Sequence, residues 1–274
     1  MIFPRAALRK FKRKRLFSFA VVLSLILGSC SGSNANSESR TLTVYAAASL
    51  TDAFTEIGRS FEGSHSGVTV VFNFGGSQNL RTQIEQGAPA DVFASANWEE
   101  MAALVTGNFT ETSAPKVFLQ NQLVVILPKN NPAGIVSLED LSRPGLKLVL
   151  AAEEVPAGRY ARQILENLNG LFGADYQHKV LANVASNEDN IRQAVTKVQL
   201  GEADASIVYV SDVVAVPELQ RVEIPTEVNV IAEYLIASLA ESVHSESANS
   251  FIDHVLSPNG QAILEKWGFT PLVP

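Results

Sequence analysis

The sequence predicts an α/β protein with two lobes, each a mainly parallel sheet flanked by helices, joined by two crossing segments. From residue 41 onward, short apolar runs alternate with amphipathic helical patterns, which is typical of β–α units. Two extended passages, 123–134 and 218–239, bracket an inserted series of such units. The chain has 274 residues, of which 46% are hydrophobic and 18% charged, so it is long and apolar enough for two lobes.

The individual elements follow from runs of β-branched and aromatic residues and from the helical spacing of apolar residues between them. The predicted strands, in chain order, are 42–47, 68–73, 91–95, 122–128, 147–151, 205–209 and 230–238. The predicted helices are 50–62, 77–87, 97–106, 137–141, 157–168, 190–201, 211–215, 244–256 and 259–266. The two passages divide the body into a first lobe, 41–122 and 229–274, and a second lobe, 123–228. A hinged pair of lobes closes around a ligand in the cleft between them.

Two strand-to-helix junctions in the first lobe each place a serine where a helix begins. LTVYAAASLTDAF contains Ser49, and VTVVFNFGGSQNLRTQI contains Ser77. Such a serine can cap its own helix with its hydroxyl. Because Ala48 and Gly76 precede them, the serines can instead face a ligand beside bare N–H groups at the positive end of the helix dipole. Two such helix ends directed at one point would form an anion site without a cation.

The second lobe contains two further helix starts of the same kind. VPAGRYARQIL places Pro156, Ala157 and Gly158 at the opening of one helix, and another helix opens near Asn190 and Ile191. Proline and small residues in a first turn are signals of a helix start. Ala157 and Gly158 have no side chain that could cover their N–H groups. A closed cleft could therefore bring four helix N-termini together, two from each lobe.

The first 29 residues are predicted to be a lipoprotein signal peptide. A basic stretch precedes an apolar run, 16–27, which is shorter than the about 20 residues that span a bilayer. The run ends in Leu-Gly-Ser-Cys, which resembles a bacterial lipobox, whose cysteine becomes lipidated. An ordinary signal peptide with an incidental Cys30 is the alternative. With residues 30–40 as a polar tether, we expect an exported protein that is anchored to a membrane by a lipid on Cys30.

Charge and residue spacing exclude several function classes. Residues 1–29 carry seven basic and no acidic side chains, so the net charge of −7 leaves −14 on the rest of the chain. This acidic body argues against nucleic acid as a partner, and any bound anion must be held by local geometry. A single cysteine excludes an internal disulfide and a cysteine-based metal cluster. The four histidines are scattered, and no pair has the spacing of metal ligands; they are His65, His178, His244 and His254. We therefore expect no metal site of this kind, and we also expect no cofactor.

Several longer segments together carry a family resemblance. They are TVYAAASLTDAF, NFGGSQNLRTQIEQGAPADVFASAN, NQLVVILPKNNP, VPAGRYARQIL, DNIRQAV, GEADASIVYVSD and PNGQAILEKWGFTP. On these segments, which cover nearly all of residues 42–270, the chain resembles the periplasmic molybdate-binding proteins of ABC transporters. The resemblance implies a type II periplasmic-binding-protein fold and a monomeric binding protein rather than an enzyme. It further implies that the protein delivers molybdate or tungstate to the permease of its transporter.

The resemblance also implies the ligand contacts, position by position. Ser49 and Ser77 would bind the tetrahedral oxyanion through their hydroxyl and backbone N–H groups. Ala157 and Ile191 would bind through backbone N–H groups, and Tyr209 through its hydroxyl. Each of these groups can donate a hydrogen bond, which suits a dianion with four equivalent oxygens. Phosphate at neutral pH keeps a proton and needs an acceptor such as a carboxylate, and no position in this set is acidic.

The sequence departs from the family pattern at two places. The run 75–79, GGSQN, replaces a more serine-rich loop but keeps Ser77, and Leu235 follows Tyr234 where a proline is common. Two other functions stay open. Sulfate is also a dianion that only accepts hydrogen bonds, so a receptor for another oxyanion such as sulfate is one alternative. An exported serine hydrolase is the other, although neither serine lies in G-x-S-x-G and no histidine has a recognisable motif.

Overall fold

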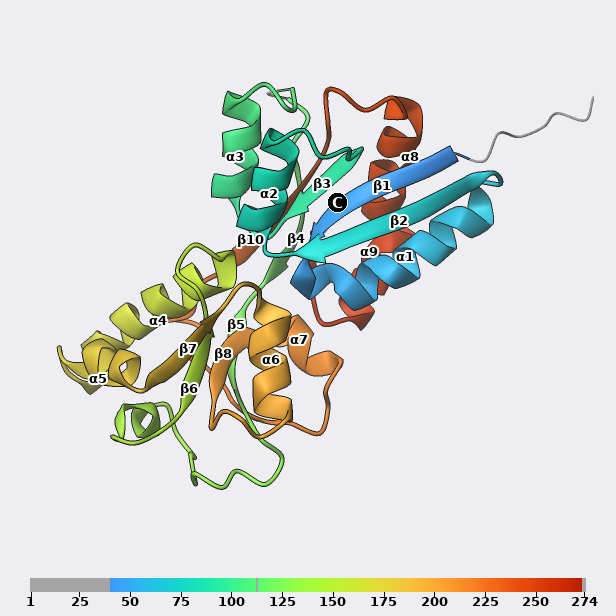
Figure 1. Cartoon of the computed structure of the whole chain (residues 1–274). Coiled ribbons are helices and arrows are strands. Elements are labelled where there is room, and N and C mark those ends of the chain that lie inside the picture. The colour runs from blue at the N-terminus through green and yellow to red at the C-terminus, as the bar shows by residue number, and fades with distance from the viewer. Residues whose placement is uncertain (1–39, 112, 273–274) are drawn as a thin grey trace, which may run out of the picture. The chain divides into compact units, whose positions relative to one another are not determined.

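The computed structural model describes residues 40–111 and 113–272, which belong to one compact unit (Figure 1). The predicted signal peptide, Cys30 and the tether up to residue 39 lie outside the described residues. The predicted α/β class is confirmed, because strands and helices alternate along the chain and the helices flank the sheets. In the described part of the chain, no helix has the length and apolar character needed to cross a membrane.

A six-stranded sheet forms the first lobe, with the strand order β11-β4-β10-β3-β1-β2. Strand β1 runs parallel to β2 and β3. Strand β10 is antiparallel to β3 and β4, and β11 is antiparallel to β4. The bounds of these strands are β1 (Arg40–Ala47), β2 (Val68–Gly75), β3 (Val92–Ser95), β4 (Lys116–Asn121), β10 (Ala232–Ser238) and β11 (Thr270–Pro271).

Helices cover both faces of this sheet (Figure 1). On the side of α1, α8 and α9, Phe54, Phe61 and Phe251 are fully buried. On the side of α2 and α3, Leu80 and Met101 pack in a separate cluster. Because both faces are covered, the central strands read as nearly continuous apolar runs. The helices are η1 (Ala48–Leu50), α1 (Thr51–Ser64), α2 (Ser77–Glu85), α3 (Trp98–Thr106), α8 (Ser245–Leu256) and α9 (Pro258–Lys266).

Two smaller sheets form the second lobe. One has β5 between β8 and β9, all antiparallel, and the other pairs β6 with β7 in parallel. A parallel bridge between Leu148 and Ala205 links them. The strands are β5 (Leu123–Leu127), β6 (Leu148–Ala151), β7 (Val184–Glu188), β8 (Ser206–Tyr209) and β9 (Gln220–Val222). The helices are η2 (Glu139–Ser142), α4 (Pro156–Phe172), α5 (Tyr176–Ala182), α6 (Ile191–Gln199) and α7 (Val210–Val214).

The chain passes between the lobes twice, at Gln122 between β4 and β5 and at residues 223–231 between β9 and β10. The Asn229 side chain ties the two passages together, because it accepts a hydrogen bond from Leu123 N–H at 3.2 Å and donates one to Leu123 C=O at 2.8 Å. Strand β10 returns antiparallel to its neighbours. The first sheet is therefore mixed, whereas the β–α pattern of the sequence predicted mainly parallel pairing.

The parallel strands of each lobe end at one edge, and helices begin directly beyond it. In the first lobe β1 and β2 end in register at Ala47 and Gly75, and η1 and α2 follow. In the second lobe β6 and β7 end shortly before α4 and α6. Ligands of α/β sheets bind outside the carboxyl ends of parallel strands. A ligand site is therefore expected at these two edges.

Candidate functional site

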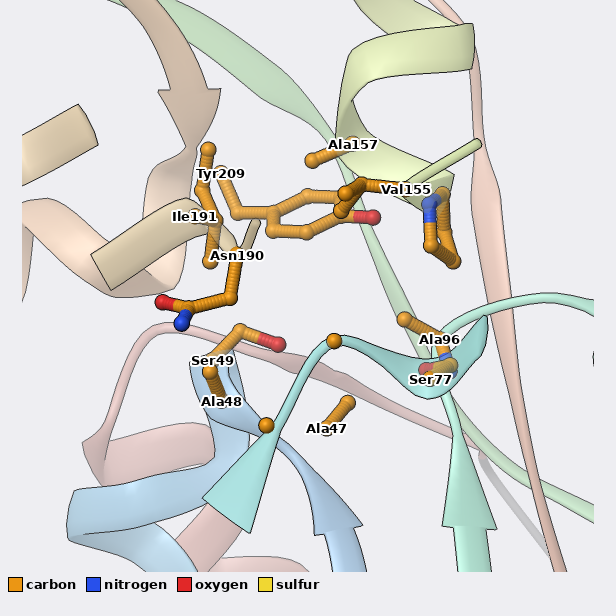
Figure 2. A pocket seen from close by; sticks show the side chains of 13 residues that line it. Ala47, Ala48, Ser49, Ser77, Ala96, Val155, Ala157, Asn190, Ile191 and Tyr209 are labelled. Carbon is orange, nitrogen blue, oxygen red and sulfur yellow. The ribbon is translucent and has the colours of Figure 1, made fainter. Parts of the chain in front are cut away.

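A narrow cavity lies where residues from the two edges meet (Figure 2). All five predicted site residues line it. The cavity has a volume of only about 10 Å³, which is about the space that one water molecule needs. The lining residues are Ala47, Ala48, Ser49, Gly75, Gly76, Ser77 and Ala96 of the first lobe and Val155, Pro156, Ala157, Asn190, Ile191 and Tyr209 of the second.

Ser49 lies in the turn η1 and is almost fully buried. Its Oγ is 2.8 Å from the hydroxyl of Tyr234, a fully buried residue of β10, and either oxygen can donate. If the Tyr234 hydroxyl donates, the Ser49 proton is free to point into the cavity. No side chain of the described residues caps η1 or α1. The alternative in which Ser49 serves only as a helix cap is therefore not what the structure shows.

Ser77 is the first residue of α2, and its hydroxyl is used in a similar way. Its Oγ accepts a hydrogen bond from Ala96 N–H at 3.1 Å, which leaves its proton available as a donor. The residue before it, Gly76, has no side chain to cap the helix. A Cβ on Gly76 would lie 2.5 Å from the carbonyl oxygen of Asp189 in the other lobe, so glycine allows the close approach of the two edges. The loop around Ser77 is therefore shaped to meet the second lobe.

The second lobe supplies backbone N–H groups at two helix starts. Ala157 follows Pro156 in the first turn of α4, and no side chain of the described residues caps that helix. Ile191 opens α6, where the Asn190 side chain accepts the hydrogen bond of Gln193 N–H instead. The N–H groups of a first helical turn have no partner within the helix. The N–H groups of Ala157 and Ile191 are therefore available to an anion, which the helix dipoles also favour.

Tyr209 ends β8, and its hydroxyl points into the cavity (Figure 2). The side chain is only 1% exposed, and its hydroxyl has no hydrogen-bond partner among the described residues. A buried hydroxyl without a partner costs about 1–3 kcal/mol, so this position is unfavourable unless a ligand completes it. Burial raises the pKa of Tyr209 well above its ordinary value. The hydroxyl therefore stays protonated and can act as a donor.

The lining of the cavity is electrically neutral, since it contains no acidic, basic or histidine side chain. Two charged residues, Asp212 and Arg192, lie near Tyr209 but outside the cavity lining. Fully buried Asp212 accepts a hydrogen bond from Tyr209 N–H at 3.3 Å, and Arg192 Nε lies 3.2 Å from the other carboxylate oxygen. Burial raises the pKa of Asp212 to about 6, although Arg192 acts in the opposite direction. The donors at this site therefore face the cavity without a cation of their own.

Tyr234 is the residue that sequence reasoning left out of the site. The sequence places it only within a predicted strand, 230–238, yet its hydroxyl contacts Ser49. No local pattern identifies that contact, because the two residues are 185 positions apart. Asp91 does not line the cavity, and its carboxylate accepts hydrogen bonds from Thr43 N–H and the Ser242 hydroxyl.

The chain is similar to known solute-binding proteins in both sequence and structure. Residues 42–270 match the family described as bacterial extracellular solute-binding protein. The molybdate-binding protein ModA of Mycobacterium tuberculosis H37Rv is 37% identical over 231 residues, which cover 84% of each chain. A solved substrate-binding domain of a putative molybdenum ABC transporter from Clostridium difficile is 30% identical with a TM-score of 0.65, covering 86% of this chain and all of that one.

Proteins that bind other ligands have the same fold. The sulfate-binding protein SubI of Mycobacterium tuberculosis H37Rv superposes with a TM-score of 0.77 over 86% of this chain and 88% of its own. Its sequence identity is only 19%, so this likeness concerns the fold alone.

Proposed function

We propose that this chain, which belongs to the bacterial extracellular solute-binding proteins, captures molybdate, and also tungstate, for an ABC importer. Its 37% identity with a molybdate-binding protein over most of both chains supports this ligand. Membership of a solute-binding family makes it a binding protein rather than an enzyme. The oxyanion is accordingly its cargo and not a cofactor.

The observation that carries the proposal is the convergence of neutral donors from both lobes on one narrow cavity. The proposed contacts are the hydroxyl and N–H groups of Ser49 and Ser77, the N–H groups of Ala157 and Ile191, and the Tyr209 hydroxyl. Hydrogen bonds to a charged partner contribute about 1.5–3 kcal/mol each. Six or seven of them would offset dehydration and leave a binding free energy of roughly −8 kcal/mol or better, which is sub-micromolar affinity.

The neutral lining also argues against two other functions. A hydrolase built on either serine would need a histidine and an acid beside it, and neither type lines the cavity. Phosphate at neutral pH carries a proton, and no carboxylate lines the cavity to accept it. Sulfate, like molybdate, only accepts hydrogen bonds but is smaller, so the dimensions of the cavity must distinguish the two.

Several parts of the proposal concern the wider protein. We place the first lobe at 41–122 and 229–274 and the second at 123–228, with the two passages acting as the hinge. The signal peptide of residues 1–29 and a lipid on Cys30 would export the protein and hold it at a membrane surface. There it would act as a monomer that docks onto the permease of its transporter.

Replacing Tyr209 with phenylalanine tests the proposed site. The variant loses one donor to the anion, so molybdate affinity should fall about tenfold or more. Because the hydroxyl has no partner among the described residues, the melting temperature without ligand should stay the same or rise slightly. Calorimetric titration and thermal melting measure the two effects.

Tyr234→Phe is the matched control, because it removes a hydroxyl of equal burial that does have a partner, Ser49. This variant should melt at a lower temperature than the parent. Parent-like molybdate affinity in Tyr209→Phe would contradict the proposed site.

A further inference from the structure

Beside the cavity, Arg192 links the two lobes through a chain of charges. It is the second residue of α6, directly after Ile191. Its guanidinium forms an ion pair with Asp52, in the first turn of α1 in the first lobe. Its Nε lies 3.2 Å from Asp212 in the second lobe. One side chain thus connects an acid of each lobe.

We infer that Arg192 is the clasp of the closed protein: a positioning residue that holds the two halves of the oxyanion site together through Asp52. The inference rests on the proposed function, since it assigns Arg192 a role in retaining the anion. Arg192 does not line the cavity itself. It acts through its neighbours, because Ile191 is adjacent in the chain and Asp212 holds the backbone of Tyr209.

The burial of Asp212 explains why the clasp is an arginine. Asp212 is 0% exposed, and a buried negative charge close to Tyr209 would repel an anion bound there. Arg192 offsets this charge. Its planar guanidinium can face two carboxylates at once, which a lysine ammonium on a flexible stem does less well. The same side chain therefore neutralises the second lobe behind the site and contacts the first lobe.

Other polar contacts also join the lobes in the described structure, among them a buried hydrogen bond from Asn121 Nδ2 to Ser211 Oγ at 2.8 Å, but these are neutral or longer contacts and weaker candidates for a clasp. Gln78 Nε2 donates to the Asp189 carbonyl at 3.1 Å, but this is a neutral hydrogen bond. Arg159 lies 3.7 Å from Glu99 and 3.9 Å from Glu100, and its side chain is 38% exposed. Long, solvated ion pairs of this kind contribute little. The Arg192–Asp52 pair is closer, and its arginine is more buried than Arg159.

Asp52→Asn tests the clasp, because it removes the negative charge that pairs with Arg192 across the lobes and leaves Asp212 paired with Arg192. In the full-length protein we expect molybdate to dissociate about three- to thirtyfold faster, since the closed state loses a charge-assisted bond. The association rate should change little, because the cavity lining is intact. The melting temperature without anion should stay within a degree or two, since Asp52 is 33% exposed. Stopped-flow fluorescence measures both rates.

Glu56→Gln is the matched control. Glu56 lies one turn further along α1, is 35% exposed, and pairs with Lys266 of the same lobe. It should lower the melting temperature and leave the dissociation rate unchanged. Unchanged dissociation in Asp52→Asn, or equally fast dissociation in Glu56→Gln, would overturn the inference.

A measurement without anion separates this inference from the proposed function. If the parent protein fails to bind molybdate, the proposed function is wrong, and small-angle X-ray scattering of both proteins still tests the clasp. Asp52→Asn should then have a larger radius of gyration than the parent. Equal radii in that case would overturn the clasp as well.

Discussion

Replacing Gly158 with alanine is expected to lower the melting temperature by roughly 4–10 °C and to weaken molybdate binding more than tenfold. A Cβ at this position would lie 1.9 Å from the carbonyl oxygen of Ala152 and 2.4 Å from that of Ala151. Neither backbone atom can move without displacing β6 from the start of α4. Overpacking of this kind costs about 1–3 kcal/mol or more, and each kcal/mol shifts the melting temperature of a domain this size by about 2–4 °C. The same displacement would move Ala157 N–H away from the cavity.

Gly170→Ala is the control for this prediction, because it lies in the same helix and a Cβ there would meet no atom within 4 Å. Alanine is about 1 kcal/mol better than glycine inside a helix, so this variant should melt at the same or a slightly higher temperature. Thermal melting of both variants gives the comparison. A parent-like melting temperature for Gly158→Ala would show that α4 does not pack against β6 as described.

Ser49→Ala and Ser77→Ala are each expected to reduce molybdate affinity by about ten- to a hundredfold. Each removes one hydrogen bond to the anion, worth about 1.5–3 kcal/mol, and 1.4 kcal/mol corresponds to a factor of ten. Ser77→Ala should lower stability without ligand moderately, since the buried Ala96 N–H loses its hydrogen-bond partner. Ser49→Ala should lower the melting temperature slightly more, because the fully buried Tyr234 hydroxyl loses its partner. Calorimetric titration measures the affinities.

Ser206→Ala provides the control for the serine variants. Ser206 is as buried as Ser77, but it does not line the cavity, and its hydroxyl has no hydrogen-bond partner among the described residues. Its removal should leave molybdate affinity unchanged. If Ser49→Ala and Ser77→Ala also bound molybdate like the parent, the site would have to lie elsewhere.

The features that could be predicted from sequence are local ones. The junctions at Ser49 and Ser77 show as a strand, small residues and an amphipathic helix within about a dozen positions, and the structure places helices there. The start of α4 is marked by Pro156, and that of α6 follows Asn190, which accepts a hydrogen bond from the helix. Spacing could therefore locate helix ends that would meet in a closed cleft. The anion contacts themselves stay a prediction.

The features that sequence reasoning missed depend on pairing between distant segments. β4 (Lys116–Asn121) runs directly into β5 (Leu123–Leu127), and only the break at Gln122 assigns them to different sheets. β7 (Val184–Glu188) has polar residues at three of its five positions, so its apolar signal is weak. The contact of Ser49 with Tyr234 requires the register of β10 in the sheet. A single sequence contains no direct record of such registers.

The interlobe ion pair illustrates the same limit. Asp52 and Arg192 are 140 positions apart, and each reads as an ordinary exposed charge on an amphipathic helix. Only the closed arrangement of the lobes brings them together beside the site. Contacts that exist in one conformation of a hinged protein leave no local pattern in the sequence.

Calorimetric titration of residues 41–274 with molybdate and, in parallel, with sulfate tests the central claim most directly. The account predicts one molybdate per chain with sub-micromolar affinity, and sulfate binding that is weaker by at least a factor of ten. The anion would then bind tightly to a body of net charge −14, because hydroxyl and N–H donors alone hold it. Sulfate binding as tight as that of molybdate, or no molybdate binding at all, would contradict it.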